Sequence, residues 1–162
     1  MPDALARTKS GWGASRANLI AQLTVGRRTG GPSQSFDTPA MAWGRDTEAE
    51  ARSAYSFYAN VDVVQVGLIK HPDLIGTHCS PDGLVGDDGL VELKCPNSAT
   101  HLSTLLNGTF AGRYVTQAMW QMAVTGRKYC DLASYDPRFP EDMRLFVRRI
   151  ERDNETISEI HT

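Results

Sequence analysis

The chain has 162 residues, 41% of them hydrophobic, and a formal net charge of −2. These values are typical of one globular domain with a buried core, and no apolar run is long enough to span a membrane. The slight negative charge argues against a protein that coats nucleic acid by charge alone, but not against an enzyme that acts on it. We expect a cytoplasmic protein, because the first residues lack the apolar core of a signal peptide.

The first part of the chain is predicted to form two helices. Apolar residues recur with helical spacing over residues 14–23, and Ser15 stands where it can cap this helix or contact a ligand at its start. The Gly, Ser, Thr and Pro residues of 26–39 predict a loop. A second helix is predicted over residues 42–58. Its buried side is expected to carry Ala51, Ala54, Tyr55 and Tyr58.

Strands are expected next. The valine-rich residues 61–69 predict a strand, and residues 79–94 predict a hairpin, since Asp-Gly near the middle is a hairpin signal. Mixed elements follow: helices from about residue 98 and over 114–124, then strands over 132–135 and 143–150. This order is α/β with mixed topology, because strand and helix do not alternate regularly.

The most informative stretch is the hairpin, Ser80-Pro-Asp-Gly-Leu-Val-Gly-Asp-Asp-Gly-Leu-Val-Glu-Leu-Lys-Cys-Pro96. Side chains alternate between the two faces of a strand, so Glu92 and Lys94 are expected to point the same way. Pairing across the hairpin can bring Asp82 beside Glu92, and two such carboxylates repel unless a divalent cation lies between them. An ammonium group near a metal-bound water can act as a base. The arrangement suits metal-dependent cleavage of a phosphodiester.

Each of these signals also has a plain structural interpretation. A bare Glu-x-Lys pattern such as Glu92 and Lys94 is more often a solvated ion pair than a site. Glu48 and Arg52 have the spacing of an ordinary ion pair on a helix surface. Gln117, on a half-buried helical stripe, has the position of a local hydrogen-bond partner. Taken singly, none of these residues establishes an active site.

Taken together, these stretches resemble the lambda exonuclease family, also called YqaJ-like viral recombinases, within the PD-(D/E)xK nucleases. The resemblance lies in three segments. Cys79-Ser80-Pro81-Asp82-Gly83 followed by Leu93-Lys94-Cys95-Pro96 is similar to the family's metal site, residues 44–52 fit its pattern Gly-x-x-x-Glu-x-x-Ala-Arg, and residues 114–117 fit Tyr-x-x-Gln.

The resemblance implies a fold and a reaction. The expected fold is α/β, a restriction-endonuclease-like core with a mixed central sheet flanked by helices. It is expected to form a single nuclease domain over residues 1–162, without the C-terminal helical segment that relatives usually carry. The implied reaction is Mg²⁺-dependent, 5′-to-3′ degradation of double-stranded DNA in phage-type recombination or end resection, with Mn²⁺ as a substitute. The implied partners are DNA ends, a single-strand-annealing protein and two further copies in a ring-like homotrimer.

The resemblance also assigns roles to residues. Asp82, Glu92 and the backbone carbonyl of Leu93 would hold the metal, and Glu48 would help to hold a second ion. Lys94 would deprotonate or orient the attacking water, with its amine fixed by Gln117. The terminal 5′-phosphate would be bound by Ser15, Ser80 and Arg7, although Arg7 is one residue further from Ser15 than the family pattern places its arginine, which leaves Lys9 and Arg16 as alternatives.

Two rival functions stay open at this point. One is a non-catalytic DNA-end-binding module of the same fold, which is disfavoured because all five positions with a chemical role are filled. The other is a related endonuclease, including the CRISPR-associated RecB-like nucleases, which often bind an iron–sulfur cluster through four cysteines. The chain has only three, Cys79, Cys95 and Cys130, without metal-site spacing. We expect these cysteines to be reduced and structural.

Overall fold

The computed structural model of the chain describes residues 7–8, 11–30 and 38–161. By its internal contacts the chain divides into two compact units, Met1–Asp37 and Thr38–Thr162. The first unit contains the short antiparallel strands β1 (Arg7–Thr8) and β2 (Gly11–Trp12) and the helix α1 (Ala14–Thr29). Among the described residues, no helix combines the length and the apolar character needed to cross a membrane.

Helix α1 differs from its prediction at both ends. Its N-cap is Gly13, so Ser15 is not the capping residue. The helix also continues to Thr29, where a loop was expected from residue 26. Arg27 and Arg28 lie in its last turn, where positive charge complements the helix dipole. Gly30 then ends the helix in the left-handed conformation, with φ of 68°.

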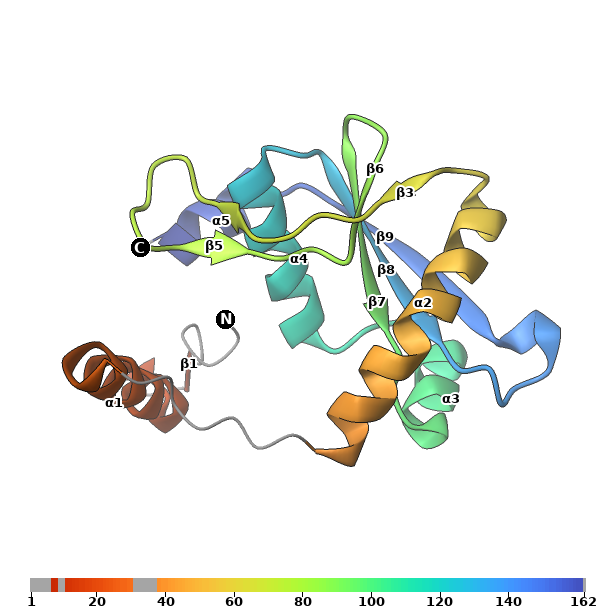
Figure 1. Cartoon of the computed structure of the whole chain (residues 1–162), viewed down its shortest axis with the longest axis horizontal. Helices are drawn as coiled ribbons and strands as arrows, with labels where there is room; N and C mark the ends of the chain where they lie inside the picture. Colours follow the sequence, from red (N-terminus) through yellow and green to blue (C-terminus); the bar gives the residue numbers. More distant parts are fainter. Residues whose placement is uncertain (1–6, 9–10, 31–37, 162) are drawn as a thin grey trace. The chain divides into compact units, whose positions relative to one another are not determined.

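The second unit is built on a five-stranded sheet with the order β3-β6-β7-β8-β9 (Figure 1). The strands are β3 (Val63–Val64), β6 (Gly83–Val85), β7 (Gly89–Lys94), β8 (Tyr129–Tyr135) and β9 (Leu145–Glu151). Only the β7–β8 pair is parallel, and the other neighbours are antiparallel. Helices α3 (Ser98–Asn107) and α4 (Gly112–Thr125) form the crossover between the parallel strands. The predicted mixed α/β fold is confirmed.

Helices cover both faces of the sheet. The alternation of side chains along β7 decides which residues contact which helix. Val91 and Leu93 belong to the core cluster that includes Ala51 and Tyr55 of α2 (Pro39–Ala59). Leu90 belongs to the opposite cluster, with the apolar residues of α4. Figure 1 shows α2 and α4 on either side of β7. Because side chains alternate, Glu92 and Lys94 face α4.

Helix α2 begins earlier than its sequence pattern suggested. Thr38 caps it by accepting a hydrogen bond from the Met41 N–H at 3.3 Å, and Pro39 occupies the first turn. Tyr55 is fully buried as predicted, but Tyr58 is 67% exposed, so its assignment to the buried side was wrong. The helix ends at Asn60, which adopts the left-handed conformation.

Several strand boundaries also differ. The stretch 61–69 forms only β3 and the first residue of β4 (Ile69–Lys70), and β4 pairs with β5 (His78–Cys79) instead of joining the large sheet. Strand β8 begins three residues before its predicted start, and a 3₁₀ turn, Glu141–Met143, precedes β9. A final helix, α5 (Asn154–His161), was not predicted. The Asp153 side chain accepts hydrogen bonds at its start, from the Glu155 N–H and the Thr156 hydroxyl.

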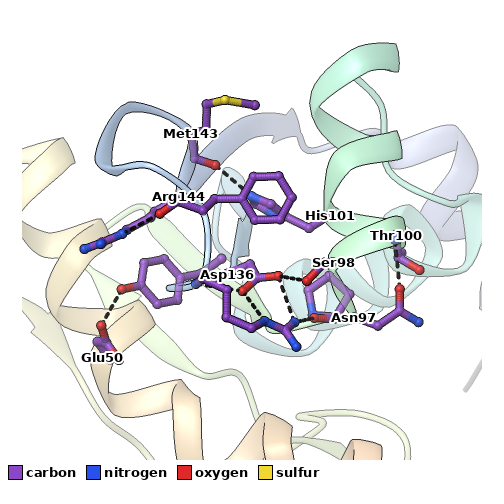
Figure 2. Close-up of polar contacts among 12 residues, drawn as sticks. Glu50, Asn97, Ser98, Thr100, His101, Asp136, Met143 and Arg144 are labelled. Carbon is purple, nitrogen blue, oxygen red and sulfur yellow. Dashed lines mark hydrogen bonds and ion pairs between the residues drawn. The ribbon is translucent and has the colours of Figure 1, made fainter.

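A polar network holds the turn that follows β8 (Figure 2). The fully buried carboxylate of Asp136 accepts hydrogen bonds from the Ser98 hydroxyl at 2.8 Å and from Arg138 Nε at 2.7 Å. His101 is also fully buried, and its Nε2 lies 2.9 Å from the Met143 carbonyl oxygen. Because a carbonyl oxygen can only accept a hydrogen bond, Nε2 carries the proton. The network fixes α3 against the end of β8.

Candidate active site

Glu92 and Lys94 lie on the face of β7 that α4 covers, as expected from the alternation. The Glu92 side chain is only 3% exposed, and its Oε1 accepts a hydrogen bond from Lys94 Nζ at 2.5 Å. Gln117 of α4 donates through Nε2 to the same oxygen at 2.5 Å, and its Oε1 accepts from Lys94 Nζ at 3.4 Å. Gln117 therefore bridges an acceptor and a donor, which fixes the orientation of its amide.

Gln121 is a further partner of Glu92. It lies one helical turn beyond Gln117, is 2% exposed, and donates through Nε2 to Glu92 Oε2 at 2.6 Å. The spacing of four residues from Gln117 was the available signal, since residues so spaced share one face of a helix.

Asp82 lies just before β6, across the hairpin from β7. Its Oδ2 accepts a hydrogen bond from the Leu93 N–H at 2.7 Å. Burial, and then the charge of Glu92, raise the pKa of Asp82 to about 7, although the Leu93 N–H and Lys94 act in the opposite direction. At the next residue, Gly83, a Cβ would lie 2.2 Å from Cγ1 of Val63, so the glycine lets β3 pack closely against β6. The two carboxylates therefore interact electrostatically.

Glu48 reaches the same place from α2. It forms an ion pair with Arg52 one turn later, as the sequence spacing suggested. Arg52 Nε also lies 3.4 Å from the backbone carbonyl of Asp82, so this arginine links α2 to the hairpin. The negative charge of Glu48 adds to the raised pKa of Asp82.

One cleft of about 630 Å³ brings these groups together. Glu48, Asp82, Glu92, Leu93 and Lys94 all line it. Arg45 of α2 and Tyr114 of α4 also line it, a place that was not predicted from the sequence. The Tyr114 ring centroid lies 5.0 Å from Lys94 Nζ, a cation–π distance.

The residues expected to bind a 5′-phosphate are placed differently. Ser80 is exposed in the segment before β6 and is not among the residues that line the cleft. Arg7 lies in β1 and Ser15 in the first turn of α1, both within the first unit. Lys9 lies outside the described residues. The phosphate-binding role of Arg7, Ser15 and Ser80 stays a prediction.

Comparison with known proteins identifies the family. The model of the YqaJ-like viral recombinase domain matches residues 8–128. The chain belongs to this family. No curated protein sequence matches it.

Solved structures agree with this assignment. The YqaJ chain is 45% identical to the alkaline exonuclease LHK-Exo from Laribacter hongkongensis, with a TM-score of 0.90 over 99% of this chain and 79% of that chain. A complex of LHK-Exo with dAMP matches at 46% identity and the same TM-score, over 99% and 78% of the two chains. A phage-related exonuclease from Haemophilus somnus 129PT shares the fold, at 12% identity and a TM-score of 0.74 over 98% and 86%. The relationship supports a nuclease of the YqaJ family.

The cleft of this YqaJ chain fits a divalent cation. No three His, Cys, Asp or Glu side chains of the described residues are grouped as a ready-made metal site. Burial and the nearby charge of Glu92 nevertheless raise the pKa of Asp82, and Lys94 offsets only part of this rise. Two carboxylates and a backbone carbonyl are hard donors, and Mg²⁺ commonly binds one or two carboxylates while keeping several waters.

The three cysteines contribute no bridge to this unit. Cys79 and Cys130 are buried free thiols, and Cys95 is a partly buried one. Burial raises the pKa of Cys79 to about 11 and that of Cys95 to about 12, so both stay protonated near neutral pH. The reduced state of the cysteines stays a prediction.

Proposed function

We propose that this YqaJ chain is a Mg²⁺-dependent exonuclease that degrades one strand of double-stranded DNA from its 5′ end, with Mn²⁺ as a substitute. The observation that carries the proposal is the convergence of Asp82, Glu92 and Lys94 on one cleft, where Gln117 of α4 contacts both Glu92 and Lys94. The similarity to LHK-Exo, an alkaline exonuclease with a dAMP complex, supports DNA as the substrate.

The carboxylates would bind the cations. Asp82, Glu92 and the backbone carbonyl of Leu93 would hold one, and Glu48 would help to hold a second. Such cations, when bound, lower the pKa of an attacking water and stabilise charge on the leaving oxygen. Arg52 pairs with Glu48 and also contacts the backbone carbonyl of Asp82. These contacts would keep the two acidic residues at a fixed spacing.

Lys94 would act on the attacking water by orienting it or taking its proton. Glu92 and Gln117 fix the amine through two contacts, and Tyr114 lies beside it. A side chain held in this way needs little reorganisation to reach its catalytic position. Gln117 contributes by position, since its amide joins the lysine to the carboxylate.

The 5′ polarity would come from recognition of the DNA end. Hydroxyl and basic groups from Ser15, Ser80 and Arg7 would bind a terminal phosphate, and Lys9 or Arg16 are the alternative sources of positive charge. A helix N-terminus, such as that of α1, favours an anion. This part of the proposal rests on the family pattern.

The proposal extends to the setting of the reaction. We place the chain in the host cytoplasm, acting on DNA ends in phage-type recombination or end resection, together with a single-strand-annealing protein. Its assembly would be a ring-like homotrimer of single nuclease domains. Light scattering coupled to size-exclusion chromatography tests the assembly, and a monomer at micromolar concentration would remove it from the proposal.

One assay tests the activity. A linear duplex with 5′-phosphates, the same duplex with 5′-hydroxyls and a closed circle are incubated with Mg²⁺ or with EDTA, and nucleotide release is followed. We expect fastest release from the phosphorylated duplex, none from the circle and none with EDTA. Efficient cutting of the circle would show an endonuclease instead. Binding of ends without any release would show a DNA-end-binding module.

A further inference from the structure

Gln121 contacts Glu92 from the core side of α4, and the proposed mechanism does not use it. Its side chain is 2% exposed, and its Nε2 lies 2.6 Å from Oε2 of Glu92. Gln117, one turn earlier on α4, donates to the other oxygen, Oε1. Two glutamines of one helix therefore hold the two oxygens of a single buried carboxylate.

The orientation of the Gln121 amide is set by its two neighbours. The Glu92 carboxylate only accepts hydrogen bonds, so the amide nitrogen must face it. The amide oxygen then faces Sγ of Cys130 at 4.0 Å. Burial raises the pKa of the fully buried Cys130 thiol well above its ordinary value, so the thiol keeps its proton and can act as a weak donor. The core thus holds Gln121 in the orientation that serves Glu92.

The donors on Glu92 are unevenly divided between its oxygens. Each carboxylate oxygen has about two acceptor sites. Lys94 and Gln117 both donate to Oε1, whereas Gln121 donates to Oε2. Among the described contacts, Oε2 therefore has a lone pair left to bind a further group. The orientation of this lone pair depends on the hydrogen bond from Gln121. Gln117 is tied to Lys94 as well, so it cannot fix the carboxylate independently of the lysine.

We propose that Gln121 is a positioning residue, which fixes the Glu92 carboxylate in the orientation that binds the cation. This inference rests on the proposed function, because it assigns Glu92 to cation binding. Hydrogen-bond partners behind a metal ligand orient it, and losing one typically lowers metal affinity or activity by about 10- to 100-fold. Gln121 is such a partner of Glu92. Its described side-chain contacts involve neither Lys94 nor the outer part of the cleft.

The test compares two substitutions on α4. Gln121→Met keeps the length of the side chain but removes the donor. Met119→Leu is the matched control, because Met119 is buried in the core cluster of the same helix and has no polar role. Calorimetric titration with Mn²⁺ alone, without DNA, measures the affinity, and thermal melts show whether each variant is folded. We expect Gln121→Met to bind Mn²⁺ about 10- to 100-fold more weakly, and Met119→Leu to match the parent chain.

The kinetics give a second readout that a purely structural role would not change. If Gln121 positions Glu92, raising the Mn²⁺ concentration should restore much of the cleavage rate of Gln121→Met, while the KM for DNA stays near that of the parent. Mn²⁺ affinity and rates equal to those of Met119→Leu would overturn the inference. If the parent chain itself neither bound Mn²⁺ nor cleaved DNA, the proposed function would fail instead.

A second variant keeps the test decisive if Gln121→Met does not fold. Gln121→Asn retains the amide but draws it back by one methylene from Glu92. Its Mn²⁺ affinity should also fall, by a smaller factor within the range expected for a hydrogen-bond partner of a metal ligand. An Asn variant that is folded and binds Mn²⁺ as tightly as the parent would overturn the role of Gln121.

Discussion

The surroundings of two aspartates in the second unit shift their pKa values in opposite directions. Asp136, in the turn after β8, is fully buried and accepts hydrogen bonds from Ser98 and from the side chain and backbone of Arg138. Burial by itself would raise the pKa of Asp136, but these bonds together lower it to about 2. Asp82, in the cleft, accepts from the Leu93 N–H and has Glu92 as a neighbour, and its pKa is raised to about 7.

The difference separates a stabilising carboxylate from one that the proposed function assigns to cation binding. The network around Asp136 supplies donors to both carboxylate oxygens, so its negative charge is stabilised without any bound ion. The cleft leaves Asp82 beside a second acid, an arrangement that costs stability and that a divalent cation would relieve. Substitutions in the two places should separate these two behaviours.

Lys94→Ala should have the largest effect. Lys94 is the positive group in contact with Glu92, and the proposed mechanism assigns it the attacking water. Removing a general acid–base group typically costs about two to four orders of magnitude in rate. We expect a loss of that size in nucleotide release from a linear duplex, with a folded chain by circular dichroism and DNA binding nearly intact.

Lys128→Ala is the matched control for that substitution. Lys128 forms an ion pair with Asp88 at 2.8 Å, but both side chains are largely exposed, so the pair contributes little. We expect cleavage by Lys128→Ala at the parent rate. Near-parental nucleotide release by Lys94→Ala would show that Lys94 is not the catalytic lysine.

Asp136→Asn should reduce stability while leaving the chemistry of the cleft in place. The substitution removes the charge that Arg138 and Ser98 recognise, and losing a buried, charge-assisted hydrogen bond costs about 1–3 kcal/mol in the free energy of unfolding. Because the pKa of Asp136 is lowered, its stabilising contribution is present above pH 4 and is lost as the pH falls toward 2. Urea unfolding at pH 7 and at pH 3 measures both effects. An unchanged midpoint at pH 7 would contradict the stabilising role.

Much of the cleft could be predicted because its signals are local. Glu92 and Lys94 are two residues apart on a strand, and the hairpin that brings Asp82 opposite them is a short-range feature with an Asp-Gly signal. Glu48 and Arg52 likewise follow from helical spacing. In each case the distance along the chain is short enough for the period of the backbone to decide which side chains meet.

The parts that were missed depend on contacts between distant segments or on competing local signals. Gln121 meets Glu92 only because α4 packs against β7, and no local pattern fixes how far along the strand the helix lies. Tyr58 lies on the same side of α2 as Tyr55, but the residues that bury this side of the helix do not reach Tyr58. In α1, glycine at residue 26 suggested a loop, but the favourable last turn with Arg27 and Arg28 continues the helix to Gly30.

Asp82→Asn is the direct counterpart of Asp136→Asn. In the parent chain without metal, the raised pKa means that Asp82 contributes stability below about pH 4, which is lost as the pH rises through about 7. Asparagine carries no charge and can still accept from the Leu93 N–H. The variant should therefore be more stable than the parent at pH 8 in EDTA, by about 4 kcal/mol, and equal to it near pH 4.

Metal should reverse that order, which makes the measurement specific to the cleft. A ligand that binds only the folded state stabilises it by mass action, so Mn²⁺ or Mg²⁺ should raise the midpoint of the parent but raise that of Asp82→Asn much less. The variant should also lose nucleotide release even at high Mg²⁺, because one negative ligand is gone. Thermal melts at pH 4 and pH 8, with EDTA and with Mn²⁺, give all four comparisons. A variant that is less stable than the parent at pH 8 in EDTA would place Asp82 with Asp136, as a structural carboxylate of the hairpin.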